Sequence, residues 1–349
     1  MNTTPFVRRA LAALAAATVV LAACGGDGGS DSAVTAATTA ASPAATTAPT
    51  SAPADDVDLS GVTLRVGDQV KLTQSLLEAS GQADTPYRIE WAAFTSGPPL
   101  LEALDADAID LGGVGDAPPI FAAASGATID VVAASKTTPW NQGILVKGDE
   151  IADVAGLEGR KVAVAKGSSA NWVLLKALQD NGLSVSDVEI VYLQPTDAQQ
   201  AFANGSVDAW AIWDPFSSVA QAQGAHLITT GEQLGIPGYT FLVSSESTLG
   251  DDAKVAAIRD LIARYRVAQA WQAEHKDEWA AKYSELTTLP LELTQNLLKV
   301  DPQAVLLDAT LIAAQQDEAD AFAGAGLIPA EVDFADFVDD RFNSVTNPN

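Results

Sequence analysis

The chain has 349 residues, 48% of them apolar, and carries 19 basic against 45 acidic side chains, for a formal net charge of −26. Binding to nucleic acid needs basic surface that replaces counterions, so no nucleic-acid partner is expected. A single cysteine and two histidines exclude a disulfide framework and a zinc site made of Cys and His. The length suits about two domains.

The first 23 residues have the pattern of an export signal. Arg8 and Arg9 precede an apolar run over residues 10–20, which is too short to span a bilayer. The run is followed by Leu-Ala-Ala-Cys-Gly, in which the cysteine is Cys24. This string resembles the bacterial lipobox, whose cysteine is diacylated and becomes the mature N-terminus. We therefore expect lipidation of Cys24; an ordinary cleaved signal is the alternative.

Residues 24–58 are predicted to be a flexible linker. They are mainly Gly, Ser, Thr, Ala and Pro with a few Asp, so they cannot bury enough apolar surface to offset the entropy of ordering. A lipid followed by such a linker places the folded part on the outer face of the cytoplasmic membrane or in the periplasm, anchored without spanning the membrane.

From about residue 58, short β-branched runs alternate with amphipathic helical patterns, which predicts an α/β fold with largely parallel sheets. After about residue 250 we expect no further strand, only two long helical runs over 255–271 and 289–322. The predicted strands are 62–66, 87–92, 109–111, 129–134, 144–146, 162–165, 190–193, 207–212 and 239–243.

Three predicted strand-to-helix turns, at 94–99, 115–119 and 166–171, are suited to holding an anion. Each offers unpaired backbone N–H groups and the positive end of a helix dipole, at the strand ends where α/β proteins bind ligands. Asp116 is the predicted N-cap of the second helix, and hydroxyls converge in the third turn. The alternative is plain capping, because α/β proteins commonly cap helices with Ser, Asp and Pro.

A fourth stretch, 207–216, carries a strand into a helix that begins at Asp214. Asp214 is predicted to be an N-cap, and its functional interpretation is a polar contact in the cleft. Trp213 is a candidate to cover the apolar tail of a ligand. By strand alternation, one of Trp210 and Trp213 is expected in the core and the other exposed. Trp140 is a weaker candidate, for which loop packing is the alternative.

Taken together, these segments resemble the aliphatic sulfonate-binding proteins of bacterial ABC importers, with a match running from about residue 62 to 330. The resemblance implies a type II periplasmic-binding-protein fold with two α/β lobes, a hinge and a helical C-terminal extension. Lobe 1 would comprise 59–145 plus 238–349, and lobe 2 would comprise 146–237. The matching segments are 97–104, 109–112, 115–122, 166–170 and 207–215, with 326–329 resembling the closing segment.

The resemblance also implies the ligand contacts. N–H groups and hydroxyls would hold the sulfonate, and Gln69 falls where the family has a polar contact. Two departures are the loop at 67–73, which lacks the family's Gly and Pro, and a lone Lys299 where paired arginines are frequent. The expected ligand-binding residues are Gln69, Ser96, Gly97, Asp116, Ala117, Ser168, Ser169, Asn171, Trp213 and Asp214.

The resemblance implies a monomer that passes an alkanesulfonate to an ABC permease and its ATPase. The same fold serves taurine, nitrate, bicarbonate and thiamine-precursor importers, so these ligands remain alternatives. A different class is an envelope-anchored hydrolase or a pyrimidine-synthase-like enzyme. However, His226 and His275 have no apparent catalytic partner, and we find no nucleophile elbow, Walker loop or metal motif. We expect no catalytic residue, metal or cofactor.

Overall fold

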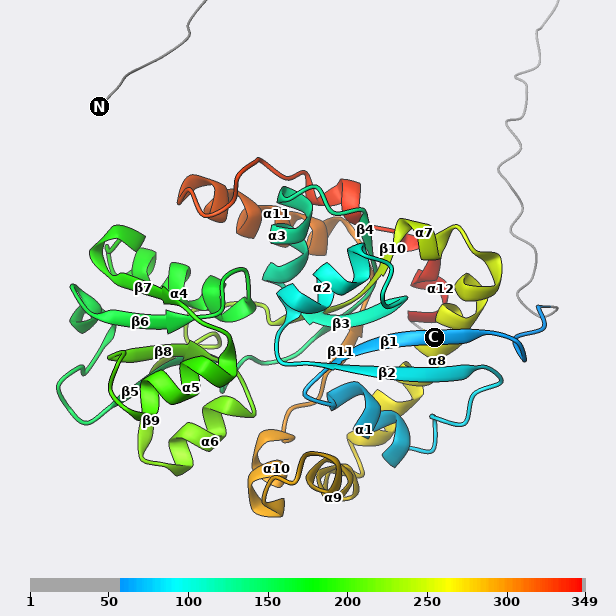
Figure 1. The fold of residues 1–349 in the computed structure, drawn as a ribbon, viewed down its shortest axis with the longest axis horizontal. Coiled ribbons are helices and arrows are strands. Elements are labelled where there is room, and N and C mark those ends of the chain that lie inside the picture. The colour runs from blue at the N-terminus through cyan, green and yellow to red at the C-terminus, as the bar shows by residue number, and fades with distance from the viewer. Residues whose placement is uncertain (1–56, 347–349) are drawn as a thin grey trace, which may run out of the picture. The chain divides into compact units, whose positions relative to one another are not determined.

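The computed structural model describes residues 57–346, which form two mixed β-sheets covered by helices (Figure 1). The strand order is β11-β4-β10-β3-β1-β2 in the first sheet and β7-β6-β8-β5-β9 in the second. The predicted α/β class and periplasmic-binding-protein fold are confirmed. The predicted signal peptide, Cys24 and the linker up to residue 56 lie outside the described residues.

In the first sheet, β1 runs parallel to β2 and β3, whereas β10 runs antiparallel to both β3 and β4. The expectation of largely parallel sheets is therefore wrong for this sheet, because β10 is the strand on which the chain returns from the second sheet. The strands are β1 (Thr63–Gln69), β2 (Arg88–Phe94), β3 (Leu111–Gly115), β4 (Ile129–Lys136), β10 (Tyr239–Ser245) and β11 (Gln303–Val305).

The second sheet repeats this arrangement. β6 is parallel to β7 and β8, and β5, on which the chain enters the sheet, is antiparallel to β8 and β9. Residues 143–145, assigned to the first lobe from the sequence, thus pair within the second sheet. The strands are β5 (Gly143–Lys147), β6 (Lys161–Val164), β7 (Glu189–Tyr192), β8 (Ala209–Ile212) and β9 (Ala225–Thr230).

Two strands were absent from the sequence prediction, and a third, β3, shares only Leu111 with the predicted run 109–111. β9 was not predicted, and β11 contradicts the expectation that strands stop near residue 250. The helical run predicted over 289–322 is broken, because Pro302 cannot continue a helix and the following residues pair antiparallel with β4. The helix over 255–271 is confirmed within α8.

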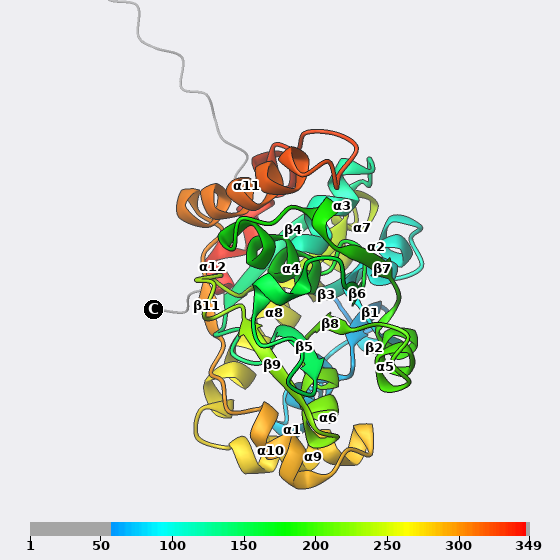
Figure 2. The same ribbon diagram turned by 90° about the vertical axis from the view of Figure 1, so that its left-hand side faces the viewer.

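Helices cover both sheets, and the apolar clusters between helices and strands form the core. Figures 1 and 2 show α11 beside α3 at one end of the first sheet and α9 with α10 at the opposite end. No helix within residues 57–346 is long and apolar enough to cross a membrane. The helices are α1 (Leu72–Ala79), α2 (Gly97–Asp105), α3 (Ala117–Ala124), α4 (Ser169–Asp180), α5 (Pro195–Ala203), α6 (Phe216–Ala222), α7 (Glu246–Leu249), α8 (Asp252–Gln272), α9 (Lys276–Thr287), α10 (Leu291–Leu297), α11 (Ala309–Gly324) and α12 (Asn343–Thr346).

The chain crosses between the sheets twice, and the two crossing segments, 137–142 and 231–238, are hydrogen-bonded to each other. The Thr137 N–H donates to the Gly238 carbonyl at 2.9 Å, and the Gly231 N–H donates to the Gln142 carbonyl at 2.8 Å. Gly238 has a φ of 71°, and a Cβ there would overlap the Thr137 carbonyl oxygen. Glycine is required at this position both by its backbone conformation and by the close approach.

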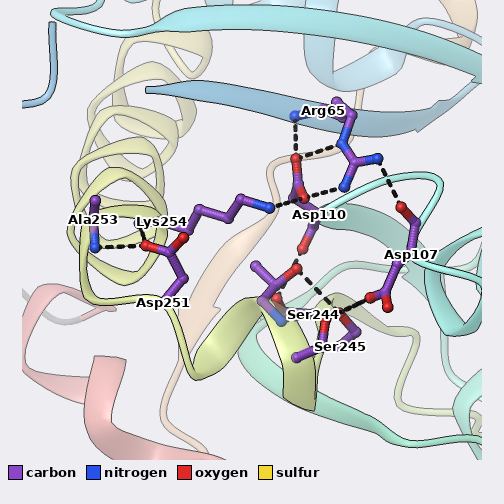
Figure 3. A network of polar contacts seen from close by, with 10 residues as sticks. Arg65, Asp107, Asp110, Ser244, Ser245, Asp251, Ala253 and Lys254 are labelled. Atoms are coloured by element: carbon purple, nitrogen blue, oxygen red, sulfur yellow. Dashed lines mark hydrogen bonds and ion pairs between the residues drawn. The ribbon is translucent and has the colours of Figure 1, made fainter. Parts of the chain in front are cut away.

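A polar network fixes one end of the first sheet, away from the crossing segments (Figure 3). The fully buried Asp110 carboxylate accepts hydrogen bonds from Arg65 of β1 and, at 2.8 Å, from Lys254 Nζ of α8. Ser244 of β10 donates to the Asp110 carbonyl. The contacts from Arg65 and Lys254 compensate the buried charge of Asp110. Together with the Ser244 contact they connect β1, β10 and α8.

Candidate functional site

A cavity of about 290 Å³ lies where the carboxyl ends of strands from both sheets meet. α3 and α11 pack against α4 on one side of the cavity, and α10 packs against α6 on the other. The first crossing segment forms part of the wall, contributing residues 137–142. A ligand in this position would contact both sheets at once.

The structure brings part of the predicted site together. The predicted residues that line the cavity are Gln69, Gly97, Ser168, Ser169, Trp213 and Asp214. Four others are not part of the lining, namely Ser96, Asp116, Ala117 and Asn171. All four are buried. Ser96 Oγ donates to Gln194 Oε1 at 2.7 Å, and the contacts of the other three are described below. Asn171 Nδ2 has no hydrogen-bond partner among the described residues.

Gln69 is the last residue of β1, and its side chain reaches the neighbouring strand of the same sheet. Its Nε2 donates to the Gly113 carbonyl at 2.8 Å. The parallel pairing of β1 with β3 places the side chain at the cavity edge. The amide oxygen of Gln69 accepts no hydrogen bond from the described residues.

The N-termini of α2 and α3 offer fewer donors than the sequence analysis expected. In α2, Pro98 and Pro99 have no N–H, so Gly97 supplies the first-turn donor. In α3 the Ala117 N–H already donates to the Asp116 carboxylate at 3.0 Å, and two prolines follow. Asp116 is thus the N-cap that was predicted, and it occupies the position that an external anion would need.

The N-terminus of α4 lies at the cavity wall, where Ser168 and Ser169 are part of the lining. Ser168 is the N-cap, accepting from the Asn171 N–H at 3.3 Å and donating to the Ala165 carbonyl at 2.7 Å. Asn171 in turn accepts from the Gly167 N–H. The N–H groups of Ser169 and Ala170 belong to the first turn and have no intrahelical acceptor. These two groups and the helix dipole are the anion-binding feature that the structure provides here.

The structure confirms that one of the two predicted tryptophans lies in the core, although the other is half-buried and not exposed. Trp210 of β8 is fully buried, whereas Trp213 is half-buried and lines the cavity together with Trp140. The Trp213 ring packs edge-on against Phe216, with centroids 6.5 Å apart. It therefore presents an apolar wall to the cavity.

Asp214 is held by the first crossing segment and by α6. Its two carboxylate oxygens accept from Asn141 Nδ2 at 2.6 and 2.7 Å, and one also accepts from the Ser218 N–H at 3.0 Å. Burial raises the pKa of Asp214, and the hydrogen bonds from Asn141 and Ser218 oppose that rise. Asp214 contacts the α6 N-terminus as predicted, although Pro215 occupies the N-cap position.

Several polar residues of the cavity were missed by the sequence analysis, among them Asn141, Arg266 and Asp68. Asn141 links the crossing segment to Asp214, and nothing in its local pattern distinguishes it from a loop residue. Arg266 of α8 is 6% exposed and lines the cavity. A signal for Arg266 existed, because it falls four residues after Ile262 and eight after Ile258, on the apolar face of its helix.

Asp68, near the end of β1, is a second buried carboxylate in the cavity wall. It accepts from the backbone N–H groups of Thr73 and Gln74 at 3.2 and 2.8 Å, which caps the start of α1. Burial raises the pKa of Asp68 to about 6, against the opposing effect of these hydrogen bonds. Within residues 57–346, no group of three or more His, Cys, Asp or Glu is placed to hold a metal ion.

Comparisons with known proteins agree with this architecture. Residues 100–275 match the NMT1/THI5-like family model. A relative from Escherichia coli K12 named for binding aliphatic sulfonates is 37% identical over 250 residues, which is 70% of this chain and 77% of its own length. A relative from Bacillus subtilis 168 with the same name is 34% identical over 290 residues. These residues are 80% of this chain and 86% of the length of the relative.

Among solved structures, the alkanesulfonate-binding protein SsuA from Xanthomonas axonopodis pv. citri, bound to MOPS, has a TM-score of 0.72 and 36% sequence identity. The similarity covers 79% of this chain and 97% of that chain. The fold, the cavity between two sheets and these relatives place the chain in the class of substrate-binding proteins. The chain belongs to the NMT1/THI5-like family, together with these sulfonate-binding proteins.

Proposed function

We propose that this protein is the extracytoplasmic substrate-binding lipoprotein of an ABC importer, and that it captures an aliphatic sulfonate for a membrane permease and its ATPase. The names of its sulfonate-binding relatives support the ligand class. The observation that carries the proposal is the cavity itself, in which the free N-terminus of α4 lies across from apolar walls. An anionic head and an alkyl tail fit such a cavity.

The contacts in this proposal come from both lobes. The N–H groups at Ser169 and Ala170, with Gly97, would bind sulfonate oxygens, and Gln69 would add a polar contact. Trp213 would cover the tail, and Asp214 would contact the ligand or hold the crossing segment. Because the ligand would touch both lobes, it would favour the closed arrangement through a rotation about the two crossing segments.

Cavity size favours an organic anion over a small inorganic one. At about 30 Å³ per molecule in liquid water, 290 Å³ corresponds to about ten waters. Nitrate would leave most of this volume to solvent, whereas an alkanesulfonate would replace it. Taurine is small enough to enter, and its ammonium would have Asp68 or Asp214 as a partner, so taurine is the competing ligand.

Calorimetric titration of the purified protein tests the ligand class. The series comprises ethane-, butane-, hexane- and octanesulfonate, with taurine, nitrate and a thiamine precursor as competitors. We expect alkanesulfonates to bind, with affinity increasing by about 0.8 kcal/mol per buried methylene until the cavity is filled. Tighter binding of taurine than of ethanesulfonate would instead identify a receptor for zwitterions, and binding of nitrate alone would contradict the proposal.

The lipid anchor on Cys24 is tested separately. Metabolic labelling with an alkyne fatty acid should label the wild-type protein and leave Cys24→Ala unlabelled. The wild type should be found in the membrane fraction. The Cys24→Ala variant, once exported, should be found in the soluble fraction. An unlabelled wild type would indicate an ordinary cleaved signal and a soluble periplasmic protein. Equal labelling of the two proteins would show that the fatty acid is not attached to Cys24.

A further inference from the structure

Arg266 is a buried cation without a partner of opposite charge. It lies on α8, is 6% exposed and lines the cavity. Within the described part of the chain it takes part in no ion pair, unlike Arg65 and Lys254, which share the Asp110 carboxylate. Among the described residues that line the cavity, the remaining charged side chains are Asp68 and Asp214, both acidic.

The hydrogen bonds of Arg266 leave part of its donor capacity unused. A guanidinium has five N–H donors. Nη1 donates to Ser135 Oγ at 2.7 Å and to Gln269 Oε1 at 2.6 Å, and Nη2 donates to the Ala134 carbonyl at 2.8 Å. All three acceptors are neutral. Nε is buried and has no partner, so two donors remain available, one of them the Nε–H.

The three neutral hydrogen bonds also fix where the guanidinium lies. Ala134 and Ser135 belong to the carboxyl end of β4, just before the first crossing segment, and Gln269 is one helical turn further along α8. The group is therefore held rigidly at the cavity wall. Desolvation lowers the pKa of Arg266, yet guanidinium stays protonated at physiological pH. A buried, fixed and uncompensated positive charge is costly unless an anion joins it.

We propose that Arg266 binds the anionic head group of the ligand through its free N–H donors and supplies the main attractive charge of the site. This inference rests on the proposed function and names Arg266 as the residue that selects an anionic ligand over a neutral one. In a chain of net charge −26, a local cation in a water-poor cavity offsets the long-range repulsion of an anion. The N-terminus of α4 would then supplement this charge from the second lobe.

The rest of the wall on this side suits an alkyl tail. α1, α9 and α10 contribute large apolar side chains to the lining, and three apolar residues after the end of α10 add to it. These residues are Leu72, Leu76, Trp279, Leu297, Leu298, Val300 and Pro302. The arrangement points to an amphiphilic anion, with a charged oxyanion head and a chain of several carbons.

Charge and tail recognition can be separated by comparing hexane-1-sulfonate with neutral 1-hexanol. The variants are Arg266→Gln, which keeps a hydrogen-bonding group, and Arg266→Lys, which keeps the charge. Arg259→Gln is the matched control, because Arg259 lies on the same helix, is not part of the cavity lining and carries the same charge. Calorimetry gives the affinities, and thermal unfolding without ligand reports on folding.

We expect Arg266→Gln to bind hexanesulfonate about 10- to 100-fold more weakly than the wild type, as for loss of hydrogen bonds to a charged group. The hexanesulfonate affinity of Arg266→Lys should lie between those of Arg266→Gln and the wild type. The affinity of Arg259→Gln should equal that of the wild type. Hexanol, if it binds, should do so equally to all four proteins. A merely structural arginine would weaken sulfonate and alcohol alike and would lower thermal stability in proportion.

A crystal of the wild-type protein with hexanesulfonate provides a test that needs no variant. A sulfonate oxygen within hydrogen-bond distance of Arg266 Nε supports the inference. A sulfonate bound elsewhere in the cavity, or unchanged affinity in both variants, overturns the role of Arg266 and leaves the proposed function intact. A wild type that binds no sulfonate overturns both.

Discussion

Gly115 of β3 and Ser169 of α4 touch across the cavity, so closely that a Cβ on Gly115 would overlap the Ser169 hydroxyl. Burial raises the pKa of Asp116, and the same hydroxyl opposes that rise. One residue belongs to the first sheet and the other begins a helix of the second lobe. The absence of a side chain at Gly115 is therefore a condition for the two lobes to meet at this point.

We predict that Gly115→Ala weakens ligand binding without unfolding either lobe. The added methyl would have to push Ser169 away, and overpacking of this kind costs about 1–3 kcal/mol, which corresponds to roughly 5- to 150-fold in affinity. Calorimetry with hexanesulfonate measures the loss. Gly324→Ala on α11 is the control, because an added Cβ there would meet no atom within 4 Å and Gly324 is not part of the cavity lining. Equal losses in the two variants would contradict the prediction.

The buried Asp68 should make anion binding depend on pH. Because burial raises the pKa of Asp68 to about 6, its carboxyl is neutral at pH 5 and ionised at pH 7.5. The negative charge gained in the cavity should then weaken sulfonate binding by roughly 1 kcal/mol, or about fivefold. Titrations at several pH values test this. Asp68→Asn should flatten the profile, and Asp149→Asn, at an exposed position, should leave it unchanged.

Asp110→Asn should lower stability without a direct effect on the cavity. Removing this charge leaves Arg65 and Lys254 without their shared partner (Figure 3), and breaking a buried pair costs about 3–5 kcal/mol. Urea unfolding measures the change. Asp180→Asn, which removes an exposed pair with Lys176, should cost less than about 0.5 kcal/mol. Similar losses in both variants would mean that burial of Asp110 has no special role.

The same network predicts a loss of stability in acid. Burial tends to raise the pKa of Asp110, but the hydrogen bonds from Arg65 and Lys254 outweigh burial and lower it. A folded-state pKa below the unfolded value of about 3.9 contributes stability that is present above that value. This stability is lost as the pH falls through the folded-state pKa. In Asp110→Asn, this part of the acid dependence should be missing.

Glu318 of α11 should make the protein less stable as the pH rises, which is opposite to the effect of Asp110. It is 3% exposed, its Oε1 has no partner, and burial together with the nearby Asp116 raises its pKa well above the usual value. Its stabilising protonated form is fully present below the unfolded-state pKa and is lost as the pH rises through the folded-state pKa. Glu318→Gln should therefore raise the free energy of unfolding at pH 8 by about 1–3 kcal/mol, measured in urea. The control variant Glu331→Gln, at an exposed position, should leave the free energy of unfolding unchanged.

The strands of the core were predictable because their β-branched runs are buried. β1, β4, β6 and β8 all coincide with runs of this kind. β9 was missed because its sequence, Ala-His-Leu-Ile-Thr-Thr, has neither a continuous apolar run nor strict alternation of polar and apolar residues. β11 has three residues, and its pairing with β4 is set by tertiary contacts that local sequence does not encode.

The site was predictable only where capping and ligand binding coincide. Ser168 and Ser169 were found because a helix N-terminus has a sequence signature. The same signature predicted Asp116 and Ala117, but the Ala117 N–H donates to the Asp116 carboxylate. Arg266 comes from a helix far along the chain, and its place at the cavity depends on how α8 packs behind β4.

The insertion of β10 between β3 and β4 constrains the order of assembly. Residues 143–230, which hold every strand of the second sheet, are continuous in the chain, so this half can be completed before the segment beyond residue 238 is available. Until then the other half keeps β3 and β4 apart, each with an open edge. Only the segment beyond residue 238 closes that gap, which makes the interval before it the period of greatest exposure to misassociation during folding.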